Sequence, residues 1–113
     1  MDKVLAYKGI IRAYVEEIYR MAPSSEEVET QLIIDDERGH YLLYSVGWEG
    51  HHWVYGSFVH LDVKPTGRVW LQHDGTDLGV AEELVRRGIP KDEIVIGFQK
   101  PSVRPHMAGW AVE

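Results

Sequence analysis

Residues 52–74, HWVYGSFVHLDVKPTGRVWLQHD, decide the fold of this chain, because they hold two β-strand patterns joined by a readable turn. In that turn, Pro65 pre-sets the φ angle of the first position and Gly67 accepts the left-handed conformation that the last position needs. A three-residue hairpin turn of this kind sets Lys64 opposite Arg68. The resulting register pairs Val63 with Val69, Leu61 with Leu71 and His60 with Gln72.

Two further breaks that contain glycine, at residues 36–39 and 49–51, divide the region before this turn. They predict four antiparallel strands near residues 29–36, 40–48, 52–63 and 68–74. Alternation places a first set of apolar residues on one face: Ile33, Tyr41, Leu43, Tyr55, Val59, Leu61, Val63, Val69 and Leu71. The second face carries Leu32, Ile34, Leu42, Tyr44, Val46, Trp48, Val54 and Phe58, then His60, Asp62, Trp70, Gln72 and Asp74. Since neither face is polar, both are expected to need cover.

An amphipathic helix is predicted before the strands. Its apolar residues recur at helical spacing from Val4 to Met21, with charged residues between them, and Pro23 ends the pattern. These charges exclude a membrane span and the apolar core of a signal peptide. Together with the absence of cysteine, they predict a cytoplasmic protein that does not bind membranes.

A second helix is predicted over residues 77–87, after the last long strand. Thr76 or Asp77 is its expected N-cap, and Gly88 is expected just after its end. A short strand follows at residues 94–98. The predicted fold class is therefore α+β, with an N-terminal helix, a four-stranded antiparallel meander, a second helix and a short terminal strand.

Length and charge limit the classes of protein to consider. The 113 residues fit one domain over residues 1–113, and 44% hydrophobic with 27% charged residues is typical of a folded chain. The formal net charge is -6, and Lys and Arg are scattered along the sequence. We therefore expect no strong direct binding to DNA, which needs clustered cations to neutralise phosphates.

The sequence Asp74-Gly75-Thr76, at the end of a strand and before a helix, is the first candidate for chemistry. It is similar to a phosphatase-type motif in which an aspartate two residues earlier attacks a phosphoryl group. Gln72 holds that earlier position, and an amide cannot act as the nucleophile. The favoured interpretation is a turn in which Asp, Gly and Thr bend the chain and cap the helix.

The six histidines raise the question of a metal site. The adjacent His51 and His52 point to opposite sides of a strand, whereas His60 and Asp74 are expected on one face. Two or three ligands without a recognisable spacing favour a hydrogen-bonded histidine over zinc. We predict no catalytic, cofactor-binding or metal-binding residue.

Four tryptophans and six tyrosines are many for this length. Aromatic residues can stack on single-stranded bases, but they do so beside grooves of Lys and Arg that this sequence lacks. A protein interface is the preferred functional interpretation, and a homo-oligomer or hetero-complex is expected. The predicted interface or polar cluster comprises Tyr44, Trp48, Phe58, His60, Asp62, Trp70, Gln72 and Asp74.

Three segments, at residues 29–48, 54–98 and 100–105, resemble the XisI family of cyanobacterial proteins, and together they span nearly the whole chain. The most distinctive pieces, in this order, are Glu29-Thr30-Gln31-Leu32, Asp36-Glu37-Arg38, Val46-Gly47-Trp48, His60-Leu61-Asp62, Asp74-Gly75-Thr76 and Gly88-Ile89-Pro90-Lys91. Their combination is far more specific than any one piece. Residues 104–111 depart from the pattern that is usual in the family.

This resemblance implies a controlling factor for excision of the fdxN element, a DNA rearrangement in which a separate recombinase performs strand exchange. XisI-like proteins are paired with XisH-like proteins, which themselves resemble nucleases. The resemblance brings no catalytic residue with it. It therefore implies a non-enzymatic accessory protein that acts with an XisH-like partner.

Two other functions stay open. The first is an antitoxin-like inhibitor, which would hold a nuclease-like partner silent by covering its site with an acidic surface. The second is a small metal-dependent hydrolase that uses His60, Asp62 and Asp74. Toxicity of the partner expressed alone distinguishes the first from a controlling factor, and metal analysis of the purified protein tests the second.

Overall fold

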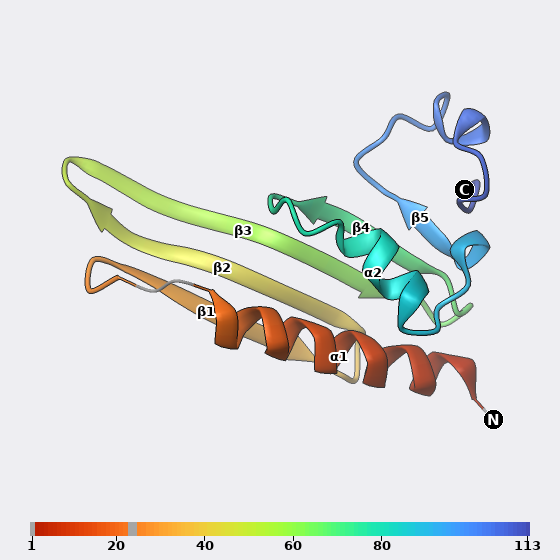
Figure 1. Ribbon diagram of the computed structural model, residues 1–113, viewed down its shortest axis with the longest axis horizontal. Coiled ribbons are helices and arrows are strands. Elements are labelled where there is room, and N and C mark those ends of the chain that lie inside the picture. The colour runs from red at the N-terminus through yellow and green to blue at the C-terminus, as the bar shows by residue number, and fades with distance from the viewer. Residues whose placement is uncertain (1, 23–24) are drawn as a thin grey trace.

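A computed structural model describes residues 2–22 and 25–113 of the chain. It contains an antiparallel four-stranded meander whose last strand is joined, in parallel, by a fifth strand (Figure 1). In chain order, the elements are α1 Lys3–Met21, β1 Val28–Asp35, β2 His40–Glu49, β3 His52–Val63, β4 Val69–Asp74, α2 Val80–Arg86 and β5 Ile94–Ile96, with short 3₁₀ turns at Lys91–Glu93 and Arg104–His106. The predicted α+β fold is confirmed.

Helix α1 forms where the apolar spacing predicts it. The Asp2 side chain caps its start by accepting a hydrogen bond from the Val4 amide at 3.0 Å. One stripe of the helix is buried, made of Tyr7, Ile11, Tyr14, Val15 and Ile18. The proline expected to end the helix, Pro23, lies outside the described residues.

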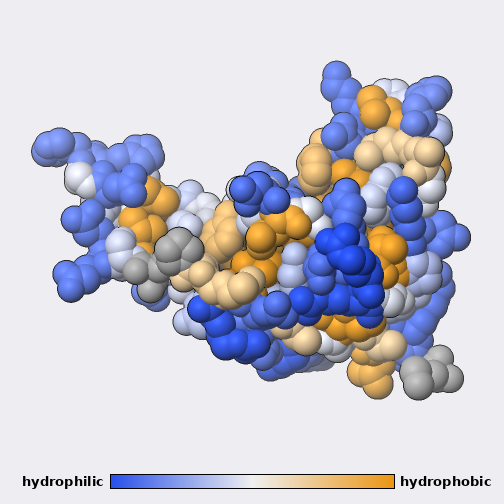
Figure 2. Space-filling view, in the orientation of Figure 1, coloured by the Kyte–Doolittle hydropathy of each residue, from blue (hydrophilic) through white to orange (hydrophobic). Residues whose placement is uncertain are grey.

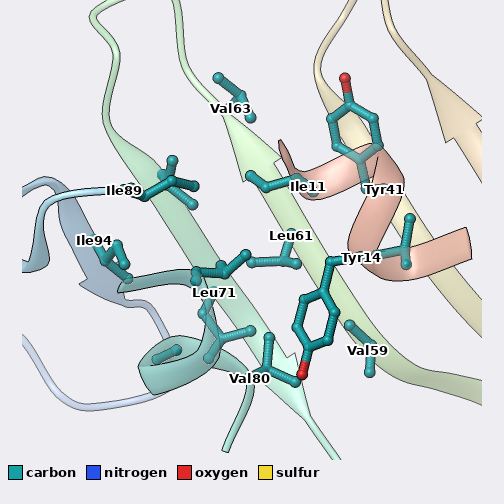
Figure 3. Close-up of a cluster of buried hydrophobic side chains, with 14 of the residues drawn as sticks. Ile11, Tyr14, Tyr41, Val59, Leu61, Val63, Leu71, Val80, Ile89 and Ile94 are labelled. Atoms are coloured by element: carbon teal, nitrogen blue, oxygen red, sulfur yellow. The ribbon is translucent and has the colours of Figure 1, made fainter. Parts of the chain in front are cut away.

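Both helices cover the same face of the sheet, which gives the molecule one hydrophobic core. Figure 3 shows side chains of α1 and α2 meeting those of β3 and β4 in this core. Its fully buried side chains include Ile11, Tyr41, Leu43, Val59, Leu61, Val69, Leu84 and Ile94. The α-helices do not meet the expectation that both faces need cover, since the opposite face of the sheet has no α-helix on it among the described residues. We call this opposite side the open face.

The turn between β3 and β4 has the predicted geometry. The Lys64 amide donates to the Arg68 carbonyl at 2.8 Å, and Gly67 has a φ angle of 93°. Val63 and Leu61 face Val69 and Leu71 as predicted.

The predicted pairing of His60 with Gln72 is wrong. A β-bulge between His60 and Leu61 shifts the register by one residue, so that His60 pairs with His73 and Val59 with Asp74. Counting from the turn cannot place such an extra residue, because the bulge depends on how both strands pack.

The predicted faces are also wrong at Ile33. The turn at 36–39 pairs Asp35 with His40, and Leu32 then pairs with Leu43 on the core side. Ile33 points to the open face instead, with 41% of its surface exposed. Because side chains alternate along a strand, an error of one residue in the register changes the face of every residue.

Helix α2 is shorter than predicted, since it begins at Val80 rather than near residue 77, and its N-cap is Gly79 instead of Thr76 or Asp77. Gly79 has a left-handed φ angle of 68°, which cannot continue a helix towards the N-terminus. The predicted end of the helix is confirmed. The Gly88 amide donates to the carbonyl of Val85 at 3.1 Å.

The C-terminal segment closes one edge of the sheet. The Ala111 amide donates to the Ile94 carbonyl at 2.9 Å, alongside β5. At the other end of the molecule, the β2–β3 hairpin reaches beyond β4 (Figure 1). In a space-filling view of the helix side, this end projects as an arm on which hydrophobic side chains lie among hydrophilic ones (Figure 2).

Replacing either of two glycines by alanine is expected to change the stability of the protein, in opposite directions. A Cβ at Gly39, where φ is 77°, would lie 2.3 Å from the Val63 carbonyl oxygen, whereas a Cβ at Gly9 in α1 would meet nothing within 4 Å. We expect Gly39→Ala to lower the free energy of unfolding by about 2 kcal/mol or more. Gly9→Ala should raise it by about 0.5 to 1 kcal/mol. Urea denaturation of both variants measures these changes, and a stable Gly39→Ala variant would contradict the assigned turn.

Candidate functional site

The open face carries two groups of side chains that form the candidate site. We define the aromatic patch as Tyr44, Trp48, Trp53 and Tyr55. We define the histidine–aspartate cluster as His40, His60 and Asp62. The patch lies towards the β2–β3 hairpin turn, and the cluster lies at the other end of the same two strands.

The aromatic patch is built by cross-strand pairing between β2 and β3. Trp48 lies directly opposite Trp53 with ring centres 5.4 Å apart, and the rings of Tyr44 and Tyr55 are 5.6 Å apart. Such tilted pairs stabilise a hairpin, but these rings remain in water. Trp48, Trp53 and Tyr55 are 59%, 47% and 67% exposed.

A second β-bulge decides which aromatic residues reach this patch. The pairing shifts between Leu43 and Tyr44, so that Leu43 faces Val59 and Tyr44 faces Ser57, with Phe58 as the extra residue. Phe58 was predicted on the open face, but it packs against the hydrophobic core. Tyr55 was predicted on the same face as Val59 and Leu61, but it lies on the open face for the same reason.

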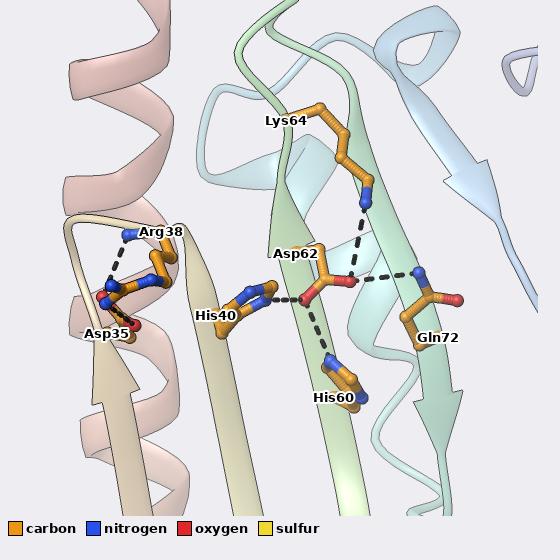
Figure 4. A network of polar contacts seen from close by, with 7 residues as sticks. All are labelled: Asp35, Arg38, His40, His60, Asp62, Lys64 and Gln72. Carbon is orange, nitrogen blue, oxygen red and sulfur yellow. Dashed lines mark hydrogen bonds and ion pairs between the residues drawn. The ribbon is translucent and has the colours of Figure 1, made fainter.

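The histidine–aspartate cluster converges on one buried carboxylate (Figure 4). His40 Nδ1 lies 2.7 Å and His60 Nε2 lies 2.9 Å from the same oxygen, Asp62 Oδ1. The second oxygen, Asp62 Oδ2, accepts a hydrogen bond from Gln72 Nε2 at 3.1 Å and has Lys64 Nζ at 4.0 Å. The two imidazoles are partly exposed, whereas the Asp62 side chain is buried.

Asp62 is held as a carboxylate by these neighbours. Burial on its own would raise the pKa of Asp62, because a charged group is costly in an apolar environment. Hydrogen bonds from His40 and Gln72 and the interaction with His60 outweigh burial, so that the pKa of Asp62 is below its ordinary value. The cluster therefore presents a fixed negative charge between two imidazoles.

Two other residues of the predicted cluster lie elsewhere. Asp74 lies on the helix side of the sheet, where Oδ1 accepts hydrogen bonds from Thr76 and Oδ2 accepts one from the Val80 amide at 3.2 Å. This matches the interpretation of Asp74-Gly75-Thr76 as a turn that caps a helix. Trp70 is on the open face, but the Arg104 guanidinium lies 5.0 Å from its ring centre, so the C-terminal segment covers it.

The sequence interpretation missed three members of the site: His40, Trp53 and Tyr55. The short turn at Gly50 and His51 was the available indication, because a two-residue turn between Glu49 and His52 places Trp48 opposite Trp53. His40 could not be found by counting from that turn, since the bulge at Phe58 intervenes. His40 is placed opposite Asp62 only when the full pairing of β2 with β3 is known.

Comparison with known proteins gives a consistent result. The family model described as XisI protein matches residues 1–112. The crystal structure of a XisI-like protein from Anabaena variabilis is 36% identical, covers 97% of this chain and 99% of its own, and has a TM-score of 0.91. The crystal structure of the fdxN element excision controlling factor XisI from the same species is 31% identical, covers 99% and 100%, and has a TM-score of 0.87. No curated protein matches the chain.

Placing a charged residue on each side of the sheet should distinguish residues of the open face from residues of the core. We expect Trp48→Glu to fold, with a free energy of unfolding within about 1 kcal/mol of the parent, because its ring is already in water. Phe58→Glu should lose more than about 2 kcal/mol, since it places a charge against the core. Circular dichroism during urea denaturation measures both, and equal losses in the two variants would contradict the assigned faces.

Proposed function

This chain belongs to the XisI family, and on that basis we propose that it is a non-enzymatic controlling factor in the excision of a DNA element. The match over residues 1–112 and the name of one structural neighbour, fdxN element excision controlling factor, support this role. The protein acts by binding another protein rather than by catalysis, and its partner is of the XisH-like kind.

One observation carries the proposal: the aromatic patch is exposed on a face that neither helix covers. Tryptophan and tyrosine are the residues that contribute most to binding at protein interfaces. Beside the patch, the outer edge of β3 from His52 to Ser57 pairs with no strand in the described part of the chain. An aromatic surface next to free backbone donors and acceptors is suited to binding a protein surface.

Charge favours a different protein as the occupant over a second copy of this chain. Two copies with a net charge of -6 each repel one another. A protein that itself acts on DNA needs basic groups for the phosphates, and a basic partner complements this acidic chain. We therefore assign the aromatic patch to the XisH-like partner.

An antitoxin-like inhibitor is the second candidate function. It uses the same acidic chain and the same partner, and differs only in the consequence of binding. The three residues of the hydrolase alternative do not lie together, because Asp74 is on the opposite side of the sheet from His60 and Asp62.

No helix among the described residues is long and apolar enough to cross a membrane. A cytoplasmic location stays a prediction, which rests on the absence of cysteine from the 113 residues. It is consistent with a partner that works on DNA.

Co-purification tests the proposed interface. We expect a tagged form of this chain to retain an XisH-like partner when the two are co-expressed, and the double variant Trp48→Glu, Trp53→Glu to weaken binding at least about tenfold. Leu5→Glu is the matched control, because Leu5 is 69% exposed on α1, outside the open face. A folded double variant that binds the partner like the parent would refute the interface. If light scattering instead shows a homo-oligomer that the double variant dissociates, the patch binds a second copy.

Gel shifts test the expected lack of DNA binding. The chain alone should bind duplex DNA only weakly and without sequence preference at near-physiological salt, because its cations are scattered. A sequence-specific complex of sub-micromolar affinity formed by the chain alone would contradict the accessory role.

A further inference from the structure

We propose that His40, His60 and Asp62 form a binding site for a divalent transition-metal ion of the zinc class. One potential ligand atom of each residue lies within 4.8 Å of the other two. The absence of a metal site was predicted from sequence because two or three ligands without a recognisable spacing favoured a hydrogen-bonded histidine, and His40 was not among the candidate ligands. The structure supplies that ligand, His40, from the neighbouring strand.

The backbone holds the three ligands in place. His40 and Asp62 are direct partners across β2 and β3, and His60 is two residues before Asp62 on the same face of β3. All three side chains therefore start from paired strands rather than from loops. Ligands on such a rigid framework lose little conformational entropy when they bind an ion.

The ligand chemistry suits zinc and similar ions. Two imidazole nitrogens and one carboxylate oxygen make up a common three-ligand set of open zinc sites. Bonds of about 2.1 Å to each atom put neighbouring ligands roughly 3.0 to 3.4 Å apart. The nitrogen-to-oxygen distances here, 2.7 and 2.9 Å, need to open only slightly. Mg²⁺ and Ca²⁺ are disfavoured, because they prefer sites made of oxygen alone.

The hydrogens on the two ligand nitrogens can be accommodated elsewhere on the imidazole rings. Without an ion, each imidazole donates the hydrogen on His40 Nδ1 or His60 Nε2 to the Asp62 carboxylate. A neutral imidazole can carry its hydrogen on either nitrogen. Binding an ion through His40 Nδ1 and His60 Nε2 therefore leaves the ring hydrogen on the other nitrogen of each imidazole.

Gln72 positions the carboxylate for this role. Its Nε2 donates to Asp62 Oδ2, which leaves Oδ1 directed at the two imidazoles. A Cβ at Gly97 would lie 2.7 Å from Gln72 Oε1, so the glycine leaves room for the amide. Outer hydrogen bonds of this kind orient metal ligands, and their loss typically weakens binding about 10- to 100-fold.

The charge of Lys64 disfavours a bound cation, and its substitution provides a sensitive test of the site. Its Nζ lies 4.0 Å from Asp62 Oδ2, where a positive charge repels a bound dication. Removing that charge while keeping the hydrogen-bonding capacity should strengthen metal binding. In a purely hydrogen-bonded cluster, the same substitution has no metal affinity to change.

Isothermal titration of the chelator-treated full chain with zinc chloride tests the site. We expect one ion per chain, with a dissociation constant in the micromolar range or tighter. His40→Asn and His60→Asn should each weaken binding at least tenfold, and Gln72→Leu about tenfold. Lys64→Gln should tighten binding roughly threefold. The double variant His51→Gln, His52→Gln at the hairpin turn is the matched control and should bind zinc like the parent.

Thermal unfolding supplies a second readout that does not depend on the titration. Zinc should raise the melting temperature of the parent and of the control but not that of His60→Asn, because an ion that binds only the folded chain stabilises it. The proposal is overturned if the parent binds zinc no more tightly than millimolar. It is also overturned if binding survives in a folded His60→Asn variant or disappears in the hairpin-turn control.

Discussion

Burial of one face of the β-sheet beneath two helices is the interaction on which the rest of this structure depends. Ile11 of α1 and Leu84 of α2 both pack into the same core. Burying apolar surface contributes about 25 cal/mol per Å², and nearly all the buried hydrophobic side chains of the described residues belong to this one core. With both helices on that side, neither helix covers the open face, and the C-terminal segment contacts it near Trp70.

Two β-bulges turn this general arrangement into a particular surface. The bulge at Phe58 sends that ring into the core and brings Tyr55 out beside Tyr44. The bulge next to His60 carries Asp74 to the helix side, where it caps the turn before α2. Each bulge adds a single residue to one strand. Together, the two bulges change which residues are exposed to water and which are buried in the core.

The open face is consequently divided into an aromatic half and a polar half. The aromatic half provides large, rigid side chains of the kind that contribute most to protein interfaces, and the proposed function places the partner there. In the polar half, a buried carboxylate lies between two partly exposed imidazoles. Both halves belong to the same pair of strands, so an ion bound at His60 would lie on the surface that carries Trp48.

The local sequence determined the elements of this protein, and the tertiary structure decided its faces. Pro65 with Gly67, the apolar spacing of α1 and the end of α2 at Gly88 could all be predicted, because turns and helices depend on residues a few positions apart. Resemblance to a family added the expected role. The bulges could not be predicted, since each depends on how the side chains of both strands pack in the assembled sheet. For the same reason, the assembly of His40 with His60 and Asp62, the exposure of Tyr55 and the position of both helices on one side were decided only when the whole sheet formed around its core.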